Sequence, residues 1–252
     1  MKRILAAVVL SMMAWPFPAL ATGLVLRYEV KTEASGPCGQ MTSYTETTMV
    51  SKGHMLRVDT RMPAIPDMFP TVPTVIYDSG EVTMTTVDHL SKTYRIISKE
   101  ELETSADFFR SVAKTMGAPH DGRPKLEPTG ATLWIGEYET AEYRAITPTG
   151  KIHLWIADSP ELQEAKKALT PVSSMGFSFL GGGYFPDPAS FVGFPAGFPI
   201  RTAIETLIGG VNFVMTMELV SLEAQEINET EFSPPKGYTE GPRPGWLPNG
   251  ER

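Results

Sequence analysis

Reactive side chains in this sequence are not spaced as they are in known catalytic motifs. The nearest match is the segment 176–181, Gly-Phe-Ser-Phe-Leu-Gly, which is one residue longer than the Gly-x-Ser-x-Gly nucleophile elbow of α/β-hydrolases. That elbow places its serine on a sharp turn between a strand and a helix, and the glycines and prolines around it here predict neither element. We therefore expect Ser178 to have no catalytic role.

Motifs for metals, nucleotides and redox cofactors are also missing. The sequence has no His-Glu-x-x-His, no Cys-x-x-Cys, no Walker A loop and no Gly-x-Gly-x-x-Gly. Cys, Met and His side chains can together bind Cu(I), and the nearest such set is Cys38, Met41, His54 and Met55, but its spacing matches no defined copper motif. We expect no cofactor, no metal and no enzymatic activity; an enzyme of an unrecognised type is the third alternative.

The histidines are scattered and predict no catalytic pair. His89 follows Asp88 in a predicted turn, where a solvated side chain is the simplest interpretation. His153 alternates with Ile152 and Leu154, so its side chain should point out of a strand, away from the core. The single cysteine, Cys38, excludes an internal disulfide and leaves an unpaired loop thiol, a reactive thiol or pairing between chains.

The first residues predict export. Lys2 and Arg3 precede an apolar run from Ile4 to about Met13, and Ala19-Leu20-Ala21 is an A-x-A cleavage signature. The run is too short for a membrane span, which needs about 20 residues. We expect residues 1–21 to be a signal peptide and the mature protein to be periplasmic or secreted.

The net charge excludes one class of partner. Cleavage after residue 21 would change the formal charge from −7 to −9, and the sequence has no basic tract. Nucleic-acid binding depends on Lys and Arg side chains that neutralise phosphates, so we expect no nucleic acid as a partner.

Hydrophobic periodicity predicts a chain rich in strands, with two helices. Alternating apolar residues and turn signals predict strands at these positions: 24–31, 41–52, 54–62, 74–77, 82–87, 93–97, 131–135, 138–146, 151–157, 200–207 and 211–222. Ser98 and Glu101 form a capping box that predicts a helix to about Met116, and Pro160 lies in the first turn of a second helix to about Val172. We expect an α+β fold in one domain, residues 22–233, followed by a loose Pro- and Gly-rich tail, residues 234–252.

The segment from Gly176 to Pro199 contains six of the twelve Phe residues, and it has too many Gly and Pro for a helix or a central strand. It could complete the core, form the wall or lid of an apolar cavity, or dock on a partner protein or a membrane surface. For the cavity, we predict a lining of aromatic and Met side chains. These are Phe177, Phe179, Tyr184, Phe185, Phe191, Phe194 and Phe198, then Phe213, Met215 and Met217 of the last long strand, and Met68 and Phe69 of a proline-rich loop.

Three groups of segments resemble a known family, the bacterial secreted proteins of domain of unknown function 4412. The first group is Arg57–Asp59, Thr74–Asp78 and Thr93–Tyr94; the second is Thr129–Gly130, Ile135–Tyr138, Glu142–Tyr143 and His153–Ala157; the third is Phe232 with Pro235–Tyr238. That family resembles the half-barrel of the outer-membrane lipoprotein carriers. The resemblance implies a curved antiparallel β-sheet with two helices on its concave face. No position matches the ligand-capping Arg of the carriers, so transport of lipoproteins is not implied.

These observations lead to one functional expectation and one alternative. We expect a non-enzymatic protein that binds a hydrophobic ligand, such as a lipid or an acyl group, in the cell envelope, with peripheral membrane contact as a further option. The alternative is an envelope protein that docks on another protein through an exposed aromatic loop.

Overall fold

The computed structural model describes residues 22–37, 39–61, 74–105, 123–147, 150–173 and 191–242. The predicted signal peptide, Cys38, the proline-rich loop and most of the aromatic segment lie outside these ranges. Within them, no helix is long and apolar enough to cross a membrane.

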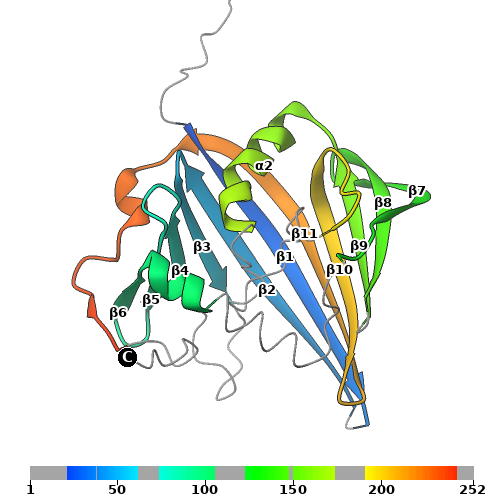
Figure 1. The fold of residues 1–252 in the computed structure, drawn as a ribbon, viewed down its shortest axis with the longest axis horizontal. Coiled ribbons are helices and arrows are strands. Elements are labelled where there is room, and N and C mark those ends of the chain that lie inside the picture. The colour runs from blue at the N-terminus through cyan, green and yellow to red at the C-terminus, as the bar shows by residue number, and fades with distance from the viewer. Residues whose placement is uncertain are drawn as a thin grey trace, which may run out of the picture.

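The described residues form one large curved sheet of twelve strands (Figure 1). Their order in the sheet is β12-β6-β5-β4-β3-β2-β1-β11-β10-β9-β8-β7. The bounds are β1 Thr22–Gly36, β2 Gly39–Lys52, β3 Met55–Arg61, β4 Thr74–Asp78, β5 Thr83–Asp88, β6 Thr93–Ile97, β7 Glu127–Ile135, β8 Tyr138–Thr147, β9 Gly150–Ala157, β10 Phe198–Ile208, β11 Val211–Glu226 and β12 Thr239–Glu240. All neighbours are antiparallel except β12 and β6. The eleven predicted strands are therefore confirmed as β1 to β11, although β1 extends five residues past its predicted end and β7 begins four residues before its predicted start.

The sheet consists of two meanders that join along their longest strands. Strands β1 to β6 follow one another as neighbours, and so do β7 to β11. β11 then returns beside β1, where the paired residues run from Thr22 opposite Glu226 to Ser35 opposite Asn212. The first and the last long strands thus lie together at the centre of the sheet.

Alternating side chains along β1 place one set on the core face, as their spacing predicts. Leu26, Tyr28 and Val30 are buried in the main hydrophobic cluster. Val25, which belongs to the other face, is also buried, at 3 % exposure. Alternating apolar residues are typical of a half-buried strand, but part of β1 is covered on both faces.

The two predicted helices lie over the same face of the sheet. The first begins at Lys99 and is described as far as Ser105. Its capping box is present, because the Ser98 amide donates to the Glu101 carboxylate and the Glu101 amide donates to the Ser98 hydroxyl. The second helix is α2, Pro160–Ser173. Leu102 of the first helix and Leu162 of α2 contact one hydrophobic cluster, which places both helices against that face.

The C-terminal segment, defined as residues 227–242, covers part of the opposite face. Its 3₁₀ turn η3, Glu229–Phe232, brings Phe232 beside Val25, Ile76 and Val87 in a second cluster. β12 then pairs in parallel with β6. A loose tail was predicted from Pro234 because of its Pro and Gly content, and this is wrong for residues up to 241. Tyr238 and the paired backbone of β12 hold that part against the sheet; residues 243–252 lie outside the described ranges.

Candidate functional site

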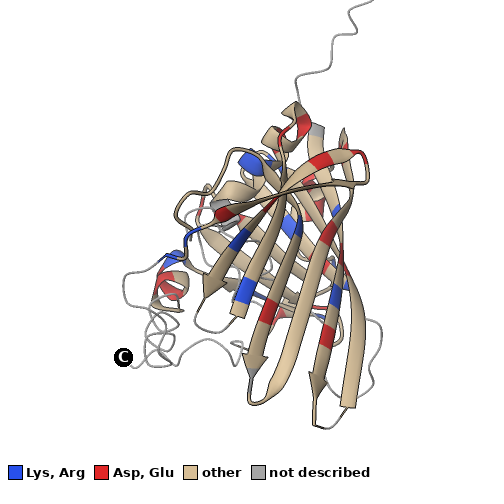
Figure 2. Cartoon of the chain, turned by 90° about the vertical axis from the view of Figure 1, so that its right-hand side faces the viewer, with Lys and Arg blue, Asp and Glu red and all other residues tan. Residues whose placement is uncertain are grey.

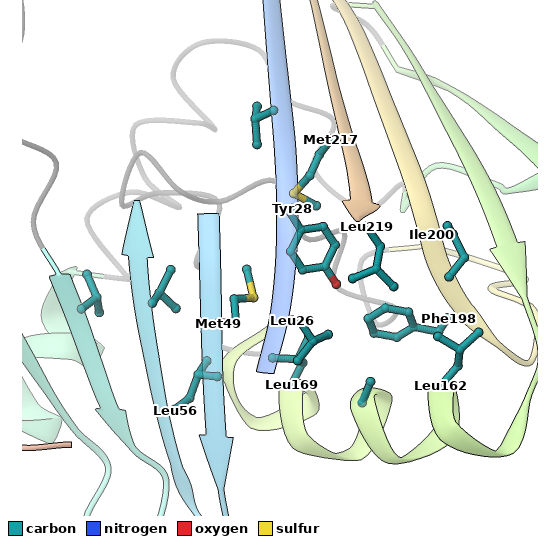
Figure 3. Close-up of a cluster of buried hydrophobic side chains, with 14 of the residues drawn as sticks. Leu26, Tyr28, Met49, Leu56, Leu162, Leu169, Phe198, Ile200, Met217 and Leu219 are labelled. Atoms are coloured by element: carbon teal, nitrogen blue, oxygen red, sulfur yellow. The ribbon is translucent and has the colours of Figure 1, made fainter. Parts of the chain in front are cut away.

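The face of the sheet under α2 carries the largest cluster of buried hydrophobic side chains in the described residues. Figure 3 shows how Tyr28 of β1, Leu219 of β11 and Phe198 of β10 point toward α2, which contributes Leu162 and Leu169. Leu162, Ala165 and Leu169 recur at helical spacing, so they form one apolar stripe. Tyr28 is fully buried here, and burial raises the pKa of its phenol well above the usual range.

This apolar face continues beyond the helix. α2 has 14 residues and a length of about 21 Å, whereas β1 and β11 have 15 and 16 residues and extend for about 50 Å. In Figure 1, α2 lies over the upper part of these strands, and no other described helix lies over their lower part. The lower part therefore has apolar side chains that α2 does not reach.

We call this lower part the distal strip and define it by Met41, Ile204, Phe213 and Met215. Strand pairing sets these side chains on one face, because residues opposite each other in a ladder share a face. Met215 faces Ile204 across β11 and β10, and Phe213 and Met41 are both opposite Ala34 of β1. The strip is only partly covered: Ile204, Phe213 and Met215 are half-buried and Met41 is 52 % exposed.

Six of the twelve predicted ligand-binding residues lie within the described ranges. Met217 and Phe198 are buried in the main cluster, and Met215 packs at its edge. Phe213 is half-buried on the distal strip. Phe191 is buried in a third cluster on β8 and β9, and Phe194 packs against it. The described aromatic residues of the segment 176–199 are thus packed against the sheet and do not project from it as a docking surface.

The other six residues lie outside the described ranges. They are Phe177, Phe179, Tyr184, Phe185, Met68 and Phe69.

One polar group is buried on the apolar face without a partner. The side chain of Thr202 on β10 is 2 % exposed, and its hydroxyl has no hydrogen-bond partner among the described residues. Thr202 lies between Leu154 and Met217 in the ladder. Sequence reasoning missed it, because a Thr in a strand is ordinary and only the tertiary structure reveals that its hydroxyl is buried.

The opposite face of the central strands is charged. One row of paired residues across the sheet consists of Arg201 on β10, Glu218 on β11, Glu29 on β1 and Glu46 on β2. Arg201 forms an ion pair with Glu218, 2.5 Å from Nη2 to Oε2. In Figure 2, acidic and basic residues are interspersed along the long strands that face the viewer. The central strands therefore have one apolar face and one face that is charged except where the C-terminal segment covers it.

A first polar network fixes the C-terminal segment to the charged side of β3 and β4. Arg57 donates to both oxygens of Asp59, and Asp59 Oδ1 is 2.5 Å from the Thr74 hydroxyl. Nε2 of His89 is 2.8 Å from the same hydroxyl, and Nδ1 of His89 is 3.0 Å from the hydroxyl of Tyr238. Five side chains from four separate parts of the chain are thus connected.

The carboxylate of Asp59 determines which groups donate the hydrogen bonds in this network. An ionised Asp59 only accepts hydrogen bonds, so the Thr74 hydroxyl donates to it and accepts from Nε2–H of His89. Nδ1 of His89 is then the atom that contacts the Tyr238 hydroxyl. Asp, Thr and His in contact suggest a nucleophile with its base, but Thr74 is 4 % exposed and its proton points to Asp59. The network is suited to anchoring and not to catalysis.

A second polar network lies on β7, β8 and β9. His153 Nδ1 is 2.8 Å from Glu142 Oε1, and the Thr129 hydroxyl donates to Oε2 of Glu142 at 2.9 Å. The imidazole stacks on Trp155, whose ring also lies 5.5 Å from the guanidinium carbon of Arg201. The bond from His153, with a smaller effect of Thr129, holds the pKa of Glu142 below its usual range.

The two networks include residues from several of the segments that carry the family resemblance. Arg57, Asp59, Thr74 and Tyr238 come from its first and third groups, and Thr129, Glu142, His153 and Trp155 from its second. The sequence pattern alone assigns these residues no physical role. The structure assigns most of them to side-chain hydrogen bonds and Trp155 to ring contacts, and His89 and Arg201 join these networks from outside the pattern.

A metal site has no support in the described ranges, where no three His, Cys, Asp or Glu side chains gather closely enough to bind an ion. Of the copper set, Cys38 lies outside these ranges, whereas Met41 and His54 are separated by nearly the whole of β2. At about 3.4 Å per residue, that separation is on the order of 40 Å. These two side chains cannot share a ligand sphere.

Comparisons with known proteins identify no family. No family model matches the sequence, and no curated protein matches it. The resemblance to domain of unknown function 4412 is therefore not confirmed.

Several solved structures match this chain, all with low sequence identity and low TM-scores. PNGF-II is 11 % identical with a TM-score of 0.35, over 86 % of this chain and 31 % of that one. An outer-membrane lipoprotein-sorting protein domain from Vibrio parahaemolyticus is 9 % identical with a TM-score of 0.32, over 84 % and 89 %. MucB in complex with MucA(peri) is 10 % identical with a TM-score of 0.34, over 89 % and 61 %. This chain spans less than a third of PNGF-II, and similarity at this level assigns it no activity.

Proposed function

We propose that this protein is a non-enzymatic, exported protein of the cell envelope that binds a hydrophobic ligand, a lipid or an acyl group. The ligand lies on the apolar face of the curved sheet, which we take to be the concave face of a half-barrel. The distal strip supports this more than any other observation, because it extends the apolar face beyond the reach of α2. Membership of the family of domain of unknown function 4412 belongs to the same proposal.

Energetics favour a ligand on the distal strip. Full burial of one Met or Phe side chain contributes about 1.5–3 kcal/mol. A ligand that covers Ile204, Phe213 and Met215 would gain several such increments, each reduced because these side chains are already half-buried. The gain must exceed the cost of ordering the ligand, which makes a long apolar molecule the best match.

Export is supported by the order of residues at the start of the chain. A short basic region, an apolar run and an A-x-A signature follow one another in residues 1–21. The charged face of the sheet is consistent with a protein that meets water on one side and the ligand on the other.

A matched pair of variants tests the proposed site. Met215→Glu places a carboxylate on the distal strip, and Thr216→Glu places the same group at the next position of β11, on the opposite face. The probe is the methyl ester of cis-parinaric acid, which fluoresces in apolar surroundings. We expect saturable binding by the wild type, binding at least tenfold weaker by Met215→Glu, and unchanged binding by Thr216→Glu.

The proposal fails if the wild type does not bind the probe. It also fails if Met215→Glu and Thr216→Glu bind it equally well while both variants unfold at the same urea concentration as the wild type.

A second candidate function is docking on another envelope protein. It is favoured by β7, which is a terminal strand of the sheet and carries Trp134 at 65 % and Leu133 at 42 % exposure. Trp134→Arg should then remove a co-purifying protein and leave probe binding unchanged; co-purification that survives Trp134→Arg would exclude this surface.

A further inference from the structure

We infer that the Thr202 hydroxyl is the polar anchor of the ligand site and donates a hydrogen bond to a neutral carbonyl, as in an ester or an amide. This inference rests on the proposed function and specifies the chemistry of the ligand.

Without a ligand, the buried Thr202 hydroxyl destabilises the folded protein. A buried donor without a partner loses its hydrogen bonds to water and costs about 1–3 kcal/mol. No described residue compensates this cost. Valine has nearly the same shape and a higher preference for strands, so packing alone would favour Val at this position. A hydroxyl at this position is explained if a ligand accepts its hydrogen bond.

The position of Thr202 connects the core to the distal strip. Its row of the ladder contains Met217 and Val30, which are both buried in the main cluster. The next row on the same face contains Ile204 and Met215, which are half-buried. Thr202 therefore lies at the inner end of the strip, and an apolar chain can extend from it along Ile204 toward Phe213.

Access to Thr202 requires a side chain to move. Met215 is the nearest half-buried neighbour across β11, and the unbranched Met side chain adapts its shape easily. Rotation of Met215 opens the row of Thr202 from the side of the strip without any change in the strands.

The side chains around Thr202 favour a neutral hydrogen-bond acceptor on the ligand over a charged one. Leu154, Met217 and Ile204 are apolar, and the nearest cation on β10, Arg201, lies on the opposite face in an ion pair with Glu218. A carboxylate buried here would have no counter-charge, which is strongly unfavourable. An ester or amide carbonyl needs only one donor, and Thr202 supplies it.

Two probes and two variants test this inference. The probes are cis-parinaric acid methyl ester, which has a carbonyl, and diphenylhexatriene, which is a hydrocarbon. Thr202→Val removes the hydroxyl and keeps the volume; Thr202→Ser keeps the hydroxyl and removes a methyl group. We expect Thr202→Val to weaken binding of the ester about three- to tenfold relative to the hydrocarbon, which is the range of one neutral hydrogen bond. Thr202→Ser should keep the wild-type ratio, and free Thr202→Val should have a higher Tm than the wild type.

The possible results separate the two proposals. If the wild type binds neither probe, the hydrophobic-ligand function fails, and the anchor fails with it. If the wild type binds both and Thr202→Val leaves the ratio of the two affinities unchanged, the ligand function stands and the anchor alone is wrong. Free parinaric acid serves as a third probe, and binding tighter than that of its methyl ester would overturn the preference for a neutral carbonyl.

Discussion

His89 and Tyr238 are 149 positions apart in the sequence and meet edge to face, with Nδ1 of the imidazole 3.0 Å from the phenol hydroxyl. His89 is in the turn between β5 and β6, and Tyr238 belongs to the C-terminal segment. Because the imidazole is also bonded to Thr74, the contact ties the C-terminal segment to the interior of the sheet.

Tyr238→Phe should loosen this connection. The variant keeps the ring and removes only the hydroxyl, so we expect a loss of about 0.5–1.5 kcal/mol in the free energy of unfolding. Amide hydrogen exchange of residues 227–242 should increase more than that of β1, because the contact holds this segment locally. The measurement is urea unfolding together with hydrogen exchange.

Tyr44→Phe is the control, since Tyr44 is 60 % exposed on β2. An equal effect of the two variants on stability and exchange would show that the hydroxyl of Tyr238 does not anchor the segment.

The pair of Glu142 and His153 should make stability depend on pH. The pKa of Glu142 is lowered from 4.5 by the bond from His153, so the folded state binds fewer protons than the unfolded state in this range. The stabilisation is therefore complete above pH 4.5 and is lost as the pH falls through the folded pKa. We expect Glu142→Gln to be less stable than the wild type at pH 5.5 and the difference to shrink by pH 3.

Urea unfolding at both pH values measures this difference. Glu46→Gln, on the exposed part of β2, is the control and should follow the wild type at both pH values. A difference between Glu142→Gln and the wild type that is the same at pH 5.5 and pH 3 would contradict the assigned bond.

Leu162 tests the packing of α2 on the sheet. Its side chain is fully buried among residues of β1, β10 and β11, so Leu162→Ala leaves a cavity and should cost about 2–5 kcal/mol. Leu90→Ala removes the same atoms from a side chain that is 74 % exposed and should change stability by less than about 0.5 kcal/mol. Similar urea midpoints for the two variants would mean that α2 does not depend on this contact.

Local patterns in the sequence predict most of the fold. The alternation in β1 and β11, the turn after Asp78 and the capping box of Ser98 and Glu101 all depend on residues close together in the chain. Such signals can be recognised in the sequence because periodicity and turn chemistry act over a few residues.

Contacts between distant segments could not be predicted in the same way. Val25 is buried because Ile227 and Phe232 cover it, and the covering residues are about two hundred positions away. His89 was expected to be a solvated turn residue, although it bonds to Thr74 and Tyr238. His153 was expected only to face out of its strand, yet its ring is bonded to Glu142 and stacked on Trp155.

The candidate site was predictable only in part. The long apolar face of β11 follows from its alternating residues, so Phe213, Met215 and Met217 were correctly placed on one face. Which of these three side chains the helix covers depends on the length of α2 relative to that of the strands. No sequence pattern gives this relation. The buried hydroxyl of Thr202 is a tertiary feature of the same kind.

Native mass spectrometry tests the central proposal most directly. The full chain, Met215→Glu and Thr216→Glu would each be produced with their own N-terminus and purified without detergent from the envelope fraction of the producing cells. We predict that the wild type and Thr216→Glu carry an additional mass, released on denaturation and recovered in an organic extract, and that Met215→Glu lacks it. An identical mass without ligand for all three proteins, or the same bound molecule on Met215→Glu, would contradict the account.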